Sequence, residues 1–587
     1  MNRTVFMWLT ATMPGFRFFN WKKMIEMRNF RALLLFFLMV IPVGAAAQSI
    51  INTVHNLSAT GPGDVRAISE SEICIFCHTP HNSRPSSPLW NKDDPGYTYT
   101  LYHSSTAEAV PGQPDGASIL CLSCHDGTTA LGNVLSRTDD IGFSGGITTL
   151  PPGSSNMSTD LADDHPISFD YTTGLAAADG QLKDPTAIVS PVTLHNGRMQ
   201  CTSCHDPHRD LTNDFLVVSN QFSELCFSCH NRDFWSFSTH STSTASWNGN
   251  GIDPWPHTPY LNVAENACES CHIPHQAGNS QRLLNELAEE NNCLPCHNGN
   301  VASTNILMQL AKPYLHNVYG YNLEHDAAED PLALSVHVEC EDCHNPHGVS
   351  NTPALAPAAN GFLTGARGVD QSGNPVDHIQ YAYELCFRCH ADSPAKPTSL
   401  TTRQIEQNNV RLEFDPASPS HHAVTSAGAN PNVPSLIAPL TESSMIYCTD
   451  CHSSDGAGAP SGPHGSIYPA QLKYQYRTAD NTLESASAYE LCYSCHSRTS
   501  ILNDESFGEH DKHIRDERTP CNACHDPHGI SNTQGNSTNN AHLINFDMSI
   551  VSPANNGMLF FESTGVFSGR CVLNCHGENH SGFNWDY

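Results

Sequence analysis

Most of the chain shows no regular alternation of hydrophobic and polar positions. Long stretches rich in Ser, Thr, Asn, Gly and Pro have neither helical nor strand periodicity. Local patterns predict short helices over residues 280–292, 382–391 and 488–497, and the first of these has the clearest helical period. The rest is predicted to be loop. From its own side chains alone, such a sequence is poorly able to form a core.

The N-terminal region has the pattern of an export signal. Basic residues precede an apolar run over residues 32–43, and Ala45, Ala46 and Ala47 follow it. We predict a signal peptide over residues 1–47, with a start of translation at Met24 or Met27 also open. The run is too short for a stable membrane span, and no later stretch of about 18 apolar residues appears. The mature chain is therefore predicted to be exported, to the periplasm, outer-membrane surface or extracellular space, without a transmembrane segment.

Twelve cysteine pairs, each followed directly by a histidine, use all 24 cysteines. Eleven read Cys-x-x-Cys-His and the last reads Cys-x-x-x-Cys-His. This is the attachment signature of c-type haem, in which two thiols bind the vinyl groups and the histidine becomes the proximal iron ligand. The predicted cofactors are therefore about twelve covalent haems c.

The predicted attachment pairs are Cys74 and Cys77, Cys121 and Cys124, Cys201 and Cys204, Cys226 and Cys229, Cys268 and Cys271, Cys293 and Cys296, Cys340 and Cys343, Cys386 and Cys389, Cys448 and Cys451, Cys492 and Cys495, Cys521 and Cys524, and Cys571 and Cys575. The predicted proximal ligands are His78, His125, His205, His230, His272, His297, His344, His390, His452, His496, His525 and His576. Zinc half-sites, redox dithiols and disulfides do not require the adjacent histidine. In the last motif the extra residue would have to bulge for both thiols to reach one ring.

The motifs form six tandem pairs, which indicates an internal repeat. Five first members continue as His-x-Pro-His, and the exception, at Cys448, is soon followed by Gly462-Pro463-His464-Gly465. We predict one two-haem module per pair, over residues 48–190, 191–257, 258–330, 331–440, 441–508 and 509–587. These motifs resemble the doubled-CXXCH multihaem c-type cytochromes, and the chain also looks like outer-surface cytochromes of metal-reducing bacteria. The resemblance implies a fold of mostly coil with short α-helices wrapped around a chain of haems, with little β structure.

The sixth iron ligand is predicted by counting. Twenty-two histidines remain after the proximal ones, whereas only six methionines follow residue 47. Bis-histidine ligation is therefore expected, which gives low-spin iron and leaves no open position. The second histidine of His-x-Pro-His is too close to its own proximal histidine to reach the opposite face of the same haem. The resemblance implies that it ligates a neighbouring haem, and the alternative is a turn histidine that binds backbone.

The distal ligands assigned on this basis are His81, His165, His208, His257, His275, His316, His337, His347, His421, His464, His513, His528 and His542. His240 is the alternative to His257, and His422 is the alternative to His421. The histidines expected to be surface or supporting residues are His55, His103, His195, His325, His378, His510 and His580.

The formal charge of the chain is −31, and the predicted mature part is more negative because the leader is basic. This surface disfavours nucleic acid and anionic membranes, and favours cationic partners, metal cations or simply solubility. We therefore predict an electron conduit rather than an enzyme, with redox proteins, outer-membrane porin–cytochrome components or metal oxides as partners. The alternatives are a reductase of nitrogen or sulfur oxyanions with one open haem, and a subunit of a cytochrome filament or porin–cytochrome complex.

Overall fold

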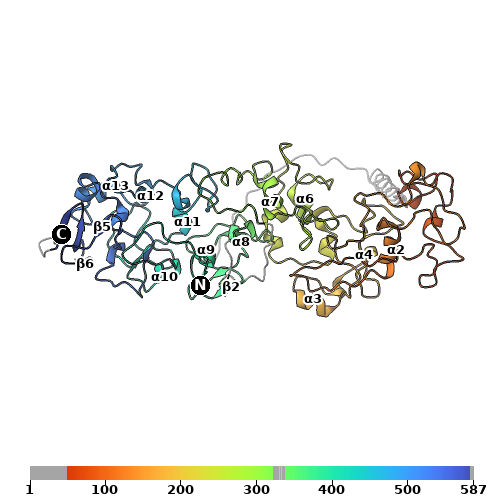
Figure 1. The fold of residues 1–587 in the computed structure, drawn as a ribbon, viewed down its shortest axis with the longest axis horizontal. Coiled ribbons are helices and arrows are strands. Elements are labelled where there is room, and N and C mark those ends of the chain that lie inside the picture. The colour runs from red at the N-terminus through yellow and green to blue at the C-terminus, as the bar shows by residue number, and fades with distance from the viewer. Residues whose placement is uncertain (1–48, 322–329, 331, 334–336, 582–587) are drawn as a thin grey trace, which may run out of the picture.

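The computed structural model describes residues 49–321, 330, 332–333 and 337–581. The predicted signal peptide and His325 lie outside the described residues. The molecule is elongated, and the chain advances along the long axis in sequence order, from α2 near one end to β5 and β6 at the other (Figure 1). Neighbouring motifs in the sequence therefore become neighbours in space.

Short helices and turns are separated by long coil, which confirms the predicted fold class. The α-helices are α2 (Gly116–His125), α3 (Thr173–Asp179), α4 (Cys201–Cys204), α5 (Thr239–Thr242), α6 (Val263–Asn266), α7 (Glu289–His297), α8 (Cys340–Cys343), α9 (Ala382–His390), α10 (Val410–Glu413), α11 (Cys448–Cys451), α12 (Glu490–Tyr493) and α13 (Arg498–Leu502). Four further motifs begin on 3₁₀ turns at η2 (Cys74–Phe76), η6 (Cys226–Ser228), η8 (Ala267–Ser270) and η12 (Cys521–Ala523).

The predicted helices agree with the structure to different degrees. The helix over 382–391 is confirmed as α9, whereas the helix over 280–292 is wrong before Glu289, where α7 begins. In that segment the Ile273 and Asn285 backbone amides donate to the Leu283 and Cys271 carbonyls, so it runs back along a haem motif instead of coiling. The helix over 488–497 shrinks to α12, which lies beside the segment over 475–477: the Arg477 amide donates to the Ala488 carbonyl, and the Leu491 amide donates to the Gln475 carbonyl.

Regular β structure is concentrated near the C-terminus. β7 (Ser568–Cys575) is the centre of an antiparallel sheet with β5 (Val551–Ser552), β6 (Phe560–Gly565) and β8 (Glu578–His580). Elsewhere, β1 (Gly368–Val369) pairs with β2 (Pro375–Val376), and β3 (Ser420–His421) pairs with β4 (Gly529–Ile530). The prediction of little β structure therefore holds outside this C-terminal sheet.

Within the described residues, buried hydrophobic side chains form several small clusters instead of one core. One cluster holds Val369, Phe387 and Phe414, and another lies under the C-terminal sheet. Buried charges also join neighbouring motifs: the Arg388 guanidinium lies 2.9 Å from the Asp342 carboxylate, and these side chains are only 3% and 9% exposed. Since Asp342 and Arg388 lie inside two successive Cys-x-x-Cys motifs, this ion pair fixes one motif against the next.

Candidate haem sites

Sites 1 to 12 are numbered here by their motifs in chain order. At sites 1 to 11 the motif forms a single helical or 3₁₀ turn, and the histidine backbone amide commonly donates to the carbonyl of the first cysteine, as at His205, His344 and His452. One turn brings side chains three residues apart to the same face, about 5–6 Å from each other. Both thiols of such a motif can therefore reach one haem edge.

In sites 1 to 11 each proximal histidine faces a second histidine across a gap. Two metal–nitrogen bonds of roughly 2 Å in line, plus the radius of each ring, put the ring centroids of a bis-histidine pair about 6 Å apart. The centroid separations are 6.1 Å for His78 and His208, 6.0 Å for His125 and His55, 6.3 Å for His205 and His275, 6.3 Å for His230 and His165, 6.2 Å for His272 and His347, 6.2 Å for His297 and His240, 6.1 Å for His344 and His464, 6.1 Å for His390 and His316, 5.9 Å for His452 and His528, 6.4 Å for His496 and His422, and 6.3 Å for His525 and His510. This spacing leaves room for one iron between the imidazoles.

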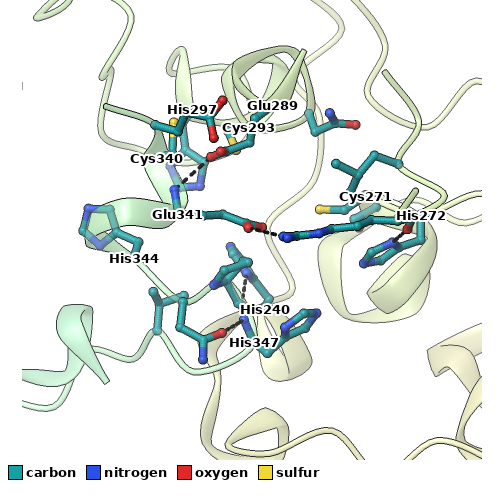
Figure 2. Close-up of a pocket in the computed structure, with 18 of the residues that line it drawn as sticks. His240, Cys271, His272, Glu289, Cys293, His297, Cys340, Glu341, His344 and His347 are labelled. Atoms are coloured by element: carbon teal, nitrogen blue, oxygen red, sulfur yellow. Dashed lines mark hydrogen bonds and ion pairs between the residues drawn. The ribbon is translucent and has the colours of Figure 1, made fainter. Parts of the chain in front are cut away.

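The pairing follows a constant shift of one module. In modules 2, 3, 4 and 6 the second histidine of His-x-Pro-His faces the first proximal histidine of the preceding module: His208, His275, His347 and His528 pair in this way. His464, in the module that lacks the motif, takes the same place opposite His344. Figure 2 shows His272, His347, His297, His240 and His344, which belong to three successive sites, around one pocket.

The proline directly before a distal histidine has a second role, which the motif alone does not reveal. The Pro207, Pro346, Pro463 and Pro527 carbonyls accept from Nδ1 of His55, His240, His316 and His422, which are the distal histidines of sites 2, 6, 8 and 10. A histidine that donates from Nδ1 has Nε2 free to bind metal. At these four places the Pro-His step supplies one histidine to an odd-numbered site and orients the distal histidine of the next even-numbered site.

The proximal histidines are oriented by backbone carbonyls as well. Nδ1 lies 2.7–2.9 Å from a carbonyl oxygen at six sites, in the pairs His125–Ser155, His205–Asp214, His272–Arg282, His344–Phe362, His452–Ala470 and His525–His542. Asp214, Ala470 and His542 have positive φ angles, so these turns are shaped to aim a carbonyl. The acceptor lies 9 to 30 residues past the proximal histidine, and its backbone atom leaves no residue-type signal in the sequence.

Burial keeps six of the proximal imidazoles in the neutral form that binds iron. It lowers the pKa of His230 to about 3, and the pKa of His297, His390, His452, His496 and His525 to about 4. Nearby histidines add to the shift in several of these sites. Since a protonated imidazole has no free lone pair, this environment favours ligation at neutral pH.

The structure departs from the assigned distal ligands at several positions. His55 and His510, expected at the surface or as supporting residues, face His125 and His525 instead. His422 rather than His421 faces His496, because side chains of adjacent extended residues point to opposite sides. His240 takes the place given to His257, whose Nε2 contacts the Glu269 carbonyl.

Four further histidines that were assigned as distal ligands do not face a proximal histidine. His337 packs against Tyr321, and the ring of His513 packs against Phe507 while its Nδ1 contacts the Glu509 carbonyl. His542 contributes its carbonyl to site 11 rather than its ring. His81 is exposed at the turn after site 1. His81 belongs to the first motif in the chain, so the module shift gives it no partner site among the described residues.

One connected cavity of about 4500 Å³ is lined by the thiols and proximal histidines of the first nine sites.

Glu289, Cys293 and Cys340 also lie close together in this cavity (Figure 2). These two thiols belong to sites 6 and 7, and burial together with the Glu341 carboxylate raises the pKa of Glu289 to about 10. This group is therefore part of the haem-binding wall. Facing imidazoles, paired thiols and a continuous cavity fit c-type haem.

Site 12 does not fit haem in the same way. Cys571 and Cys575 both lie in β7, where Cys571 pairs with Phe561 and Cys575 with Val551. Along a strand, residues four apart are separated by about 13 Å, which is too far for one haem edge. Nε2 of His576 lies 2.8 Å from the Asp480 carboxylate rather than facing a second imidazole. The predicted bulge is absent from this motif.

Comparison with known proteins identifies the arrangement. The doubled CXXCH motif family matches residues 195–234, 260–302 and 438–500, which hold sites 3 and 4, 5 and 6, and 9 and 10. The chain is a multihaem c-type cytochrome, and these three stretches match the doubled CXXCH motif. It is 23% identical to the multihaem cytochrome MtrA of Shewanella baltica over 320 residues, 52% of this cytochrome and 69% of MtrA. It is 22% identical to the polyhaem cytochrome OmcB of Geobacter sulfurreducens over 573 residues, 79% of this cytochrome and 71% of OmcB.

Electron transfer is the activity that these similarities support. Among its described residues, the cytochrome has no helix with the length and apolar character needed to cross a membrane.

Replacing His347 by alanine should open the iron of site 5, to which His272 belongs, and leave attachment at Cys340 and Cys343 intact. The cytochrome should gain one high-spin haem that binds carbon monoxide, measured by absorbance and electron paramagnetic resonance. His257→Ala is the matched control, since His257 faces the Glu269 carbonyl, and it should stay fully low-spin. A wholly low-spin His347→Ala cytochrome that binds no carbon monoxide would refute the pairing.

The count of attached haems tests site 12. Because β7 separates its thiols, we expect intact mass to give eleven covalent haems for the cytochrome and for the Cys571→Ala, Cys575→Ala double variant alike. Cys521→Ala with Cys524→Ala is the control and should lose one haem. A double variant at 571 and 575 with one haem fewer than the parent would show that site 12 is loaded.

Proposed function

We propose that this cytochrome is an electron conduit whose haem sites lie in one line in sequence order. The observation that carries the proposal is the contact between successive motifs. Between modules, first cysteines lie within hydrogen-bonding reach: Cys121 and Cys201, Cys226 and Cys268, Cys293 and Cys340, Cys386 and Cys448, and Cys492 and Cys521. Within modules, second cysteines are neighbours, as are Cys77 and Cys124, and Cys271 and Cys296.

This alternation joins sites 1 to 11 without a gap. Each motif touches the preceding one through one thiol and the following one through the other, so its haem would have a neighbour on either side. When bound, the haems supply one-electron chemistry at iron. The protein holds the iron ligands and sets the order of the sites.

The N-terminal segment and the net charge of the chain suggest where the cytochrome acts. The leader-like segment over residues 1–47 supports export, and the negative surface supports cationic redox proteins or metal cations as partners. We propose an acceptor at the outer membrane or outside the cell, through porin–cytochrome components or metal oxides. The paired imidazoles at sites 1 to 11 leave those irons without an open position, which favours a conduit over an oxyanion reductase.

Removing a central site should divide the line. With the protein fixed to an electrode by a C-terminal tag, Cys340→Ala with Cys343→Ala removes site 7 and should isolate sites 1 to 6. In fast voltammetry this variant should lose more than half of the transferred charge. Cys74→Ala with Cys77→Ala, which removes the terminal site 1, is the control and should lose only the charge of one haem. Equal losses in both variants would mean that the haems exchange electrons with the electrode independently.

A further inference from the structure

The even-numbered sites share one environment around their distal histidines, whereas the odd-numbered sites do not. At sites 2, 4, 6, 8 and 10 a proline carbonyl contacts Nδ1, and the two imidazole planes are 58–83° apart. At the odd-numbered sites the planes are 6–51° apart. Differences in reduction potential caused by the surroundings of the distal histidine should therefore arise mainly at the odd-numbered sites.

Two odd-numbered sites place a buried carboxylate against the distal ligand. Nδ1 of His275, at site 3, lies 3.0 Å from the Asp164 carboxylate, and Nδ1 of His528, at site 9, lies 3.1 Å from that of Glu413. The Asp164 and Glu413 side chains are only 6% and 7% exposed. The Gln276 backbone amide also donates to the Asp164 oxygen, 3.2 Å away, which fixes its position.

The remaining odd-numbered sites lack such a buried anion at Nδ1. At site 1 the carboxylate of Asp206 is 3.5 Å from His208, whose side chain is 61% exposed, and at site 5 the Arg232 guanidinium contacts His347. Within the described residues, Nδ1 of His464 and of His510 is buried without a hydrogen-bond partner. Sites 3 and 9 are thus distinguished from the other sites by geometry alone.

A carboxylate that accepts the Nδ1 proton makes the imidazole a stronger electron donor through Nε2. Stronger donation and a nearby negative charge both stabilise ferric over ferrous iron, and the effect is largest where water is excluded. We infer that Asp164 and Glu413 tune their sites, and make sites 3 and 9 the lowest-potential haems of the chain. The inference rests on the proposed bis-histidine conduit. Two haems that are hard to reduce, at sites 3 and 9, would divide the line of sites into segments.

Asp164→Asn and Glu413→Gln keep the side-chain shape and remove the negative charge. In potentiometric titration of the haem-loaded protein, each variant should shift one haem out of the lowest-potential component, and the double variant should shift two. The ratio of reduced to oxidised haem at fixed potential should rise about tenfold at the altered site, which corresponds to about 59 mV for one electron. The two variants lie in different modules, so each tests the inference if the other fails to fold.

Asp160→Asn and Glu406→Gln are the matched controls, because these carboxylates are exposed and near the same segments, and they should leave the titration unchanged. Titration curves of Asp164→Asn and Glu413→Gln that overlay the parent, with all haems still low-spin, would overturn the inference. Failure of the conduit would be seen separately: His275→Ala and His528→Ala would then create no high-spin haem.

Discussion

The structure depends on the pairing of two imidazoles from different modules across a gap of about one iron atom. Because the second histidine comes from the following module at the odd-numbered sites 1 to 9, as with His208 opposite His78, each such pair crosslinks two repeats. The proline next to that histidine orients the distal ligand of the neighbouring even-numbered site, as Pro346 does for His240. One tetrapeptide therefore joins three sites, and no module before the last can complete its ligands alone.

This constraint explains a fold with little regular structure. The hydrophobic clusters are small and separate, and much of the wall of the long cavity consists of motif residues. Short turns are sufficient to present thiols and imidazoles, while coil segments return to supply carbonyls such as that of Asp214 to the His205 ring. Folding should then be coupled to the cofactors, as in other metal-nucleated domains, because the ligand pairs take the place of a continuous core.

The sequence predicted the parts of the site that depend on residue type. Spacing identified the attachment thiols and proximal histidines as candidates, and the His-x-Pro-His repeat pointed to His208, His275, His347 and His528 as ligands of other haems. It could not separate His421 from His422, since the choice depends on which side of an extended segment faces His496. It also missed His510 and the carbonyl acceptors, because these depend on how distant coil folds back. The helix expected before Glu289 failed for a similar reason: its apolar residues serve a segment that binds a haem motif.

The most direct test of this account is a cryo-EM or crystal map of the haem-loaded protein that resolves both axial ligands of every iron. The account predicts one iron between the imidazoles of each pair from His78 with His208 to His525 with His510, in sequence order along the molecule. Irons ligated by histidines of their own module at sites 1, 3, 5, 7 or 9, or haems out of sequence order, would contradict it.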